Sequence, residues 1–201
     1  MLRYLFLAGL GSMALAPAAA AQWAAGLEAG ADRIVRMIEP RPGSESVPGR
    51  AALAWPLAAR IERGGEGWRV GATASVVNPA LELEGPTVSV QLRPAFRIIT
   101  IAPEVSARLA RLPHGGTVRL HLGLPLERWA FTGYADPPRW RVGVAASAAL
   151  ELPLVGALAA RVGVGAGTLL RNPLTETELT EEYTTTAVWR RSLRVGMLWR
   201  P

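Results

Sequence analysis

The 201-residue sequence contains no cysteine, no lysine and only two histidines. Without cysteine the chain can form neither a disulfide framework nor a thiolate-bound zinc or iron–sulfur centre, and two histidines argue against a histidine-rich metal centre. The mature chain lacks an apolar run long enough for a transmembrane helix, yet 50% of all residues are hydrophobic, which excludes intrinsic disorder. We therefore expect a folded protein with no metal and no other cofactor.

All 22 basic residues are arginines, and they outnumber the 16 acidic residues. A basic chain is a candidate for nucleic-acid binding, but such binding needs basic residues clustered on one surface. Here the arginines are spread along the whole chain at the spacing of strands. We therefore expect no nucleic-acid partner.

The first 21 residues are typical of a secretory signal peptide. Arg3 precedes the apolar run 5–15, and the small-residue stretch 17–21 ends in an Ala-x-Ala cleavage site. An anchoring helix is the alternative, but the apolar run is short and is flanked by glycine and proline. The sequence thus predicts a signal peptide over 1–21 and one exported domain over 22–201.

From residue 22 onward, apolar residues alternate with small or charged ones at a period of two. Successive side chains of a strand point to opposite faces, so this pattern predicts strands with one apolar face each. Eight strands are expected, over about 23–36, 50–62, 68–76, 87–98, 118–127, 139–152, 158–171 and 189–200. The alternation weakens between 99 and 116, where a short helix, a strand extension and an excursion under the sheet all stay open.

Eight such strands can close into a barrel with either face inward. With the apolar faces inward, the protein is a soluble periplasmic lipocalin-like barrel that binds a lipid or another apolar ligand. With the apolar faces outward, it is an all-β, eight-stranded antiparallel up-and-down transmembrane β-barrel. We favour the second, because the other face consists mainly of glycine, alanine and isolated charges, which suits a crowded interior better than a solvated surface.

Aromatic residues on the apolar faces support the membrane interpretation. In an up-and-down barrel they fall at strand ends, where amphipathic rings are most stable at the level of the lipid headgroups. The predicted girdles are Trp23, Trp68, Phe96 and Trp199 on the side of the termini, and Trp140 and Trp189 on the other side. Trp55 and Trp129 do not follow this pattern. Tight turns at 63–66 and 154–156 contrast with long links at the far end, the asymmetry expected of periplasmic turns and external loops.

With its signal peptide, alternating strands, girdles and a final strand ending at Trp199, the chain resembles the family of small eight-stranded outer-membrane β-barrel domains. That family includes the membrane domain of outer membrane protein A. The resemblance implies a monomer in the bacterial outer membrane, surrounded by lipid and lipopolysaccharide and inserted by the barrel-assembly machinery. Family members usually end on an aromatic residue that this machinery reads. Here Arg200 and Pro201 follow Trp199, so we expect that recognition to be weakened or displaced.

The inward faces predict an ion-pair network. An eight-stranded barrel is just wide enough for side chains to fill, and buried charges persist when they are paired. The expected members are Glu28, Glu62, Glu127, Glu151, Arg60, Arg69, Arg93, Arg119, Arg161 and Arg194. Arginines outnumber carboxylates in this set, so water or mobile anions are expected between them. A packed interior predicts no open pore, and an anion-selective conduit is the alternative.

Three arginines are predicted on the lipid-facing surface near its external end: Arg33, Arg128 and Arg191. Arginine binds phosphate in a bidentate geometry, so a lipopolysaccharide contact is one interpretation. Ordinary snorkelling of long side chains into the headgroup region is the other.

The chain carries no recognisable catalytic site. Barrel enzymes such as lipid A deacylases place a serine and a histidine, with an acidic or amide partner, on the membrane-facing surface. Here His121 is predicted to face inward and His114 lies in a His-Gly-Gly turn, so we interpret both as structural. The acidic loop 175–182 could bind a cation or a partner protein, and a solvated loop is the simpler interpretation. We expect a non-enzymatic protein with a structural or surface-interaction role.

Overall fold

The computed structural model describes residues 22–43, 49–84, 89–92, 96–132, 137–175, 179 and 181–201. The predicted signal peptide, residues 1–21, and Arg93 of the predicted network lie outside the described residues. Within the described part of the chain, no helix is long and apolar enough to cross a membrane.

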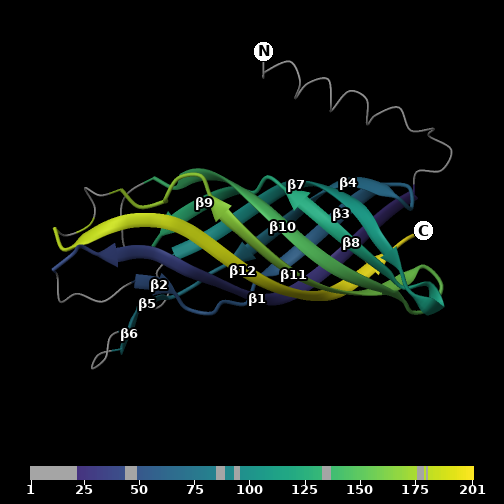
Figure 1. Cartoon of the computed structure of the whole chain (residues 1–201), viewed down its shortest axis with the longest axis horizontal. Coiled ribbons are helices and arrows are strands. Elements are labelled where there is room, and N and C mark those ends of the chain that lie inside the picture. The colour runs from purple at the N-terminus through teal and green to yellow at the C-terminus, as the bar shows by residue number, and fades with distance from the viewer. Residues whose placement is uncertain are drawn as a thin grey trace, which may run out of the picture.

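The chain forms a closed antiparallel β-barrel, seen from the side in Figure 1. The wall strands are β1 (Gln22–Pro40), β3 (Leu57–Gly64), β4 (Trp68–Val77), β7 (Phe96–Arg111), β8 (Thr117–Gly123), β9 (Leu126–Phe131), β10 (Arg139–Pro153), β11 (Leu158–Leu169) and β12 (Tyr183–Trp199). β8 and β9 form a single wall element on either side of Pro125, because both pair with β7 and with β10. Each wall element pairs with the next, and β12 returns to pair with β1. The predicted eight-stranded up-and-down barrel is confirmed.

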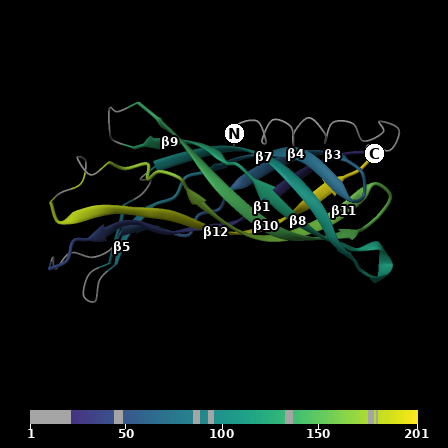
Figure 2. The same cartoon turned by 45° about the horizontal axis from the view of Figure 1, so that its top comes forward.

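Three short strands lie outside the barrel wall at the end away from the C-terminus (Figures 1 and 2). They are β2 (Gly49–Ala51), β5 (Leu81–Glu84) and β6 (Ser89–Leu92), and they follow β1 in the order β1-β2-β5-β6. This side sheet corrects two predicted strands. The strand expected over 50–62 is divided between β2 and β3, because only Ala54 of the intervening residues bridges to β1. The strand expected over 87–98 is divided between β6 and the start of β7.

Of the three interpretations of segment 99–116, strand extension is the correct one. β7 continues to Arg111, and a single 3-10 turn, η3 (Pro113–Gly115), leads into β8. His114 in this turn adopts a left-handed backbone conformation with φ 62°. The alternation is weak here because small or polar residues occupy the inward positions, and Pro103 and Ala107 dilute the outward apolar face. All turns on the side of the termini are therefore short.

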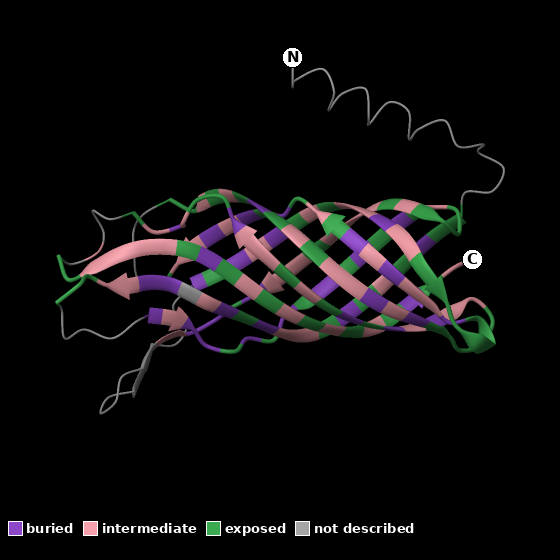
Figure 3. Cartoon of the chain, in the orientation of Figure 1, coloured by how far each residue is buried: buried purple, intermediate pink, exposed green. Residues whose placement is uncertain are grey.

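The apolar faces point outward. Burial alternates along the wall strands in Figure 3, and Leu27 in the middle of β1 is 73% exposed. The same band of exposed apolar side chains includes Leu57, Ile61, Val70, Ile101, Leu122, Val144, Val164 and Val195. A continuous apolar band of this kind is the surface that a membrane-spanning barrel presents to lipid. The alternative of a lipocalin-like barrel with an apolar cavity is therefore wrong.

Phe96 is not a girdle residue. Its side chain is 2% exposed and packs inside the barrel against Trp129 and Phe131. The prediction failed because it assumed a single alternation of inward and outward residues from 87 to 98. In β7 the alternation starts afresh, and the even-numbered residues point inward. The other girdle residues, Trp23, Trp68, Trp199, Trp140 and Trp189, lie on the outer surface and are each between 50% and 62% exposed.

Candidate functional site in the barrel interior

Carboxylates from five wall strands point into the barrel, where arginines from neighbouring strands meet them. The acidic residues are Glu28 and Asp32 on β1, Glu62 on β3, Glu104 on β7, Glu127 on β9 and Glu151 on β10. Their arginine partners are Arg60, Arg69, Arg119, Arg161, Arg190, Arg194 and Arg200. These ion pairs form one network in the half of the barrel near the termini and two separate pairs nearer the external end.

Arg60 lies at the centre of the network. Its Nε donates a hydrogen bond to Glu28 Oε1 at 2.9 Å, and its Nη1 donates to Glu62 at 3.1 Å and to Glu104 at 2.6 Å. The Arg60 side chain is only 6% exposed. One buried guanidinium thus contacts carboxylates from three strands.

His121 on β8 lies between two arginines and two carboxylates. Its Nε2 is 3.2 Å from Arg161 Nη2, and its Nδ1 is 3.5 Å from Glu104 and 3.6 Å from Glu62. Nδ1 also lies 3.4 Å from Arg60 Nη1, so the ring contacts both arginines as well as both carboxylates. Arg161 also donates to Glu28 Oε1 at 2.5 Å. This arrangement gives His121 a structural place in the network.

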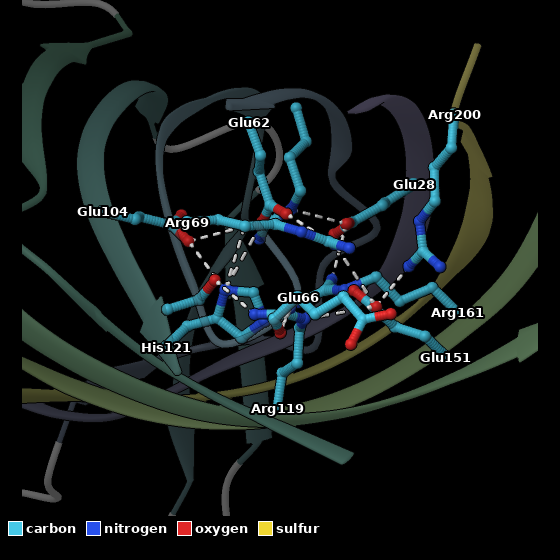
Figure 4. A network of polar contacts seen from close by, with 12 residues as sticks. Glu28, Glu62, Glu66, Arg69, Glu104, Arg119, His121, Glu151, Arg161 and Arg200 are labelled. Atoms are coloured by element: carbon cyan, nitrogen blue, oxygen red, sulfur yellow. Dashed lines mark hydrogen bonds and ion pairs between the residues drawn. The ribbon is translucent and has the colours of Figure 1, made fainter. Parts of the chain in front are cut away.

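Nearer the termini, Glu151 forms ion pairs with three arginines (Figure 4). Arg69 lies 3.5 Å from both Glu62 and Glu151, which joins this cluster to Arg60. Arg119 lies 3.5 Å from Glu151 and also donates to the backbone carbonyl of Glu66. The third arginine is Arg200, the residue that follows the last strand. The end of the barrel is therefore closed by charged side chains.

Toward the external end, the polar interior gives way to an apolar cluster. Arg190 pairs with Glu127 at 2.8 Å, and the indole Nε1 of Trp129 donates to the same carboxylate at 3.0 Å. Arg194 pairs with Asp32 at 2.7 Å. Beyond these pairs lies an apolar cluster that joins residues of the wall to Ala51 of the side strand β2. Its buried members are Ile34, Met37, Ala51, Ala54, Val77, Phe96, Ile98, Trp129, Leu169 and Val188.

A cavity of about 140 Å³ lies between the network and the apolar cluster. Its lining includes Glu28, Thr73 and Thr100, and each of these side chains has a buried oxygen without a hydrogen-bond partner among the described residues. A polar cavity of this size has room for a few water molecules. Among the residues that the structure describes, no group of three or more histidine, aspartate or glutamate side chains is arranged to hold a metal ion.

The structure describes nine of the ten residues predicted for the network, all except Arg93. It joins seven of them into the connected network: Glu28, Glu62, Glu151, Arg60, Arg69, Arg119 and Arg161. Glu127 and Arg194 instead belong to the two separate pairs. Sequence reasoning missed Glu104, which lies in the segment where no strand was assigned, although its phase on an extended strand points it inward.

The sequence matches no protein-family model and no curated protein. The fold is similar to that of Neisserial surface protein A, with a TM-score of 0.57 and 11% identity over 89% of this chain and 97% of that one. It is also similar to the outer membrane protein OprG from Pseudomonas aeruginosa, with a TM-score of 0.55 and 10% identity over 90% and 97% of the two chains. At this identity the likeness concerns the fold. The chain has the fold of the small eight-stranded outer-membrane β-barrel proteins.

Proposed function

We propose that this protein is a monomeric integral protein of the bacterial outer membrane, without an open pore and without enzymatic activity. Its role is structural or lies in interactions made by its external end. The observation that carries the proposal is that side chains occupy the lumen on both sides of its cavity: Arg119 and Glu151 are 1% exposed on one side, and Trp129 is 0% exposed on the other.

The outer surface supports the membrane location. Trp199 and Trp189 stand on the outward face of β12, ten residues apart. Ten residues with a rise of about 3.3 Å each and a strand tilt of about 40° span roughly 25 Å along the barrel axis. This span matches the roughly 25 Å apolar band that outer-membrane barrels present between their aromatic girdles.

The pairing of interior charges argues against an anion-selective conduit. Each of the seven arginines named above as partners of the interior carboxylates has a carboxylate oxygen within 3.5 Å. Selection of anions by a pore needs cationic side chains that remain available to a passing ion. Here the guanidinium groups are held by fixed carboxylates, and the apolar cluster separates them from the external end.

The external end offers a firm surface for interactions. β1 and β12 continue their pairing as far as Pro40 and Tyr183, beyond the level of Trp189. Asn172 Nδ2 donates hydrogen bonds to the backbone carbonyls of Met37 at 2.7 Å and Thr186 at 2.8 Å. These bonds tie the chain after β11 to both strands, so the wall extends as an ordered platform above the membrane.

Conductance measurements on the folded, purified protein in planar lipid bilayers test the closed lumen. We expect no discrete channel openings in concentrated KCl, while a general porin added to the same bilayer supplies the positive control. Stepwise openings with anion selectivity would contradict the proposal and favour the conduit.

A further inference from the structure

Near the external end, four of the described arginines on the outward face have no carboxylate partner. They are Arg33 on β1, Arg97 on β7, Arg128 on β9 and Arg191 on β12. The structure gives none of the four a hydrogen bond or ion pair with another described residue. The residues directly beside them on the same face are Ala166, Ile99, Ala130 and Trp140, none of which is acidic.

These arginines form two cross-strand pairs. Arg33 lies directly opposite Arg191 in the β1–β12 ladder. Arg97 lies opposite Ala130 and Arg128 opposite Ile99, so Arg97 and Arg128 are diagonal neighbours on one face. Like charges placed side by side on a sheet destabilise it unless an opposite charge compensates them.

Both pairs lie at the same height in the membrane. Arg33 is ten residues along β1 from Trp23, and Arg97 is ten residues along β7 from Ala107, the neighbour of Trp68. Ten residues of tilted strand span roughly 25 Å along the axis, the height of the apolar band. The pairs therefore stand at the external headgroup level if the barrel crosses the membrane as proposed above.

The two pairs lie on opposite sides of the barrel. β3 and β4 separate them in one direction around the wall, and β10 and β11 in the other. Arg33, Arg128 and Arg191 are therefore not one cluster. Arg128 belongs instead with Arg97, which faces outward because Phe96 faces inward, the reverse of the phase expected for strand 87–98.

We propose that each arginine pair binds a phosphate group on the sugar headgroup of lipopolysaccharide. A phosphate monoester carries a charge between about −1.5 and −2 near neutral pH, which two guanidinium groups can balance. Each guanidinium offers a planar fork that matches two phosphate oxygens. A phospholipid diester carries one charge and leaves half of the pair uncompensated. The proposal rests on the outer-membrane location proposed above.

Binding of fluorescently labelled lipid A to the folded barrel in detergent tests this proposal. The variants are Arg33→Gln/Arg191→Gln and Arg97→Gln/Arg128→Gln, which remove the charge of one pair each. The matched control is Arg63→Gln, because Arg63 is also exposed but stands over the ring of Trp23 at the periplasmic girdle, 5.3 Å from its centroid. We expect each double variant to bind about half as much lipid A as the unaltered protein, because the affinity of the altered pair falls about tenfold while the other pair stays intact. The control should bind like the unaltered protein.

Three further ligands separate the sources of phosphate. Dephosphorylated lipid A, phosphatidylglycerol vesicles and inorganic phosphate should each bind at least tenfold more weakly than lipid A. An unchanged amount of lipid A bound by both double variants, an equal loss in Arg63→Gln, or equal binding of any of these three ligands would overturn the proposal.

Folding of each variant is checked by the shift in gel mobility on boiling. If a glutamine double variant does not fold, the corresponding lysine variant keeps the charge, loses the bidentate fork and should bind lipid A with intermediate affinity. Unchanged affinity in the lysine variant would overturn the bidentate contact. A folded barrel that binds lipid A and dephosphorylated lipid A equally would refute this inference alone. A chain recovered outside the membrane would refute the proposed function.

Discussion

Arg60 shows how single residues stabilise the barrel interior. Its guanidinium holds carboxylates from β1, β3 and β7 within 3.1 Å, in a site from which water is largely excluded. Removing such a buried cation costs stability mainly because the carboxylates that remain are buried with neither solvent nor a charged partner. Exposed pairs behave differently, since solvent screens them and their side chains move freely.

We therefore expect Arg60→Met to lower the free energy of unfolding by about 3–5 kcal/mol. Arg108→Met is the matched control, because Arg108 pairs with Glu66 at the surface and its side chain is 26% exposed. Its cost should stay below about 1 kcal/mol. Urea unfolding in detergent, followed by tryptophan fluorescence, measures both variants. Equal midpoints for the two would contradict the central role of Arg60.

At the scale of a single strand, Gly196 allows β12 to pack closely against its neighbours. Gly196 lies between Glu28 on β1 and Arg161 on β11 in the register of the two ladders. A Cβ at Gly196 would lie 2.9 Å from the Cα of Glu28 and would also meet the carbonyl oxygen of Leu27. The missing side chain thus lets the Glu28–Arg161 ion pair form across β12, where the barrel closes.

Gly196→Ala should destabilise the barrel by about 1–3 kcal/mol through overpacking. Gly163→Ala is its control, because the nearest atom to a Cβ at Gly163 is the carbonyl oxygen of Ala148 at 3.4 Å. Alanine is favoured over glycine in a strand by about 0.5–1 kcal/mol, so this control should be neutral or slightly stabilising. The temperature at which the compact gel band converts to the unfolded one reports both effects. A Gly196→Ala band as stable as that of Gly163→Ala would rule out the close approach.

The elements that the sequence predicts well are those whose inward positions hold small or charged residues and whose outward positions hold branched ones. Strands β4 and β10 follow the expected ranges for this reason. The expectation fails before β7, because β6 leaves the wall and the alternation restarts there. A change of one residue in phase moves every side chain to the other face, which inverted both Phe96 and Arg97.

Most members of the candidate site were predictable from the sequence, but their pairing was not. Isolated charges at inward positions mark Glu28, Glu62 and Arg60 as members of an interior network, because such charges need partners. Which arginine meets which carboxylate depends on the register between strands, and no local pattern encodes that register. The same holds for the place of Arg200 beside Glu151 and for the pairing of Arg97 with Arg128.

The whole molecule is a barrel turned inside out relative to a soluble protein. A network of paired charged side chains lies inside, and apolar side chains form the outer band between two levels of tryptophan. Such a surface is compatible with lipid and would aggregate in water. The closed β1–β12 seam leaves no free edge in the wall, so we expect that detergents alone do not unfold the barrel.

The most direct test of this architecture is the gel mobility of the protein extracted from a purified outer-membrane fraction, with and without boiling in detergent. We predict recovery in the membrane fraction and a clear difference in mobility between the boiled and unboiled samples, because the closed barrel stays compact until heat opens it. Recovery in the soluble periplasm without detergent, with no shift on boiling, would contradict the outward orientation of the apolar faces and the account built on it.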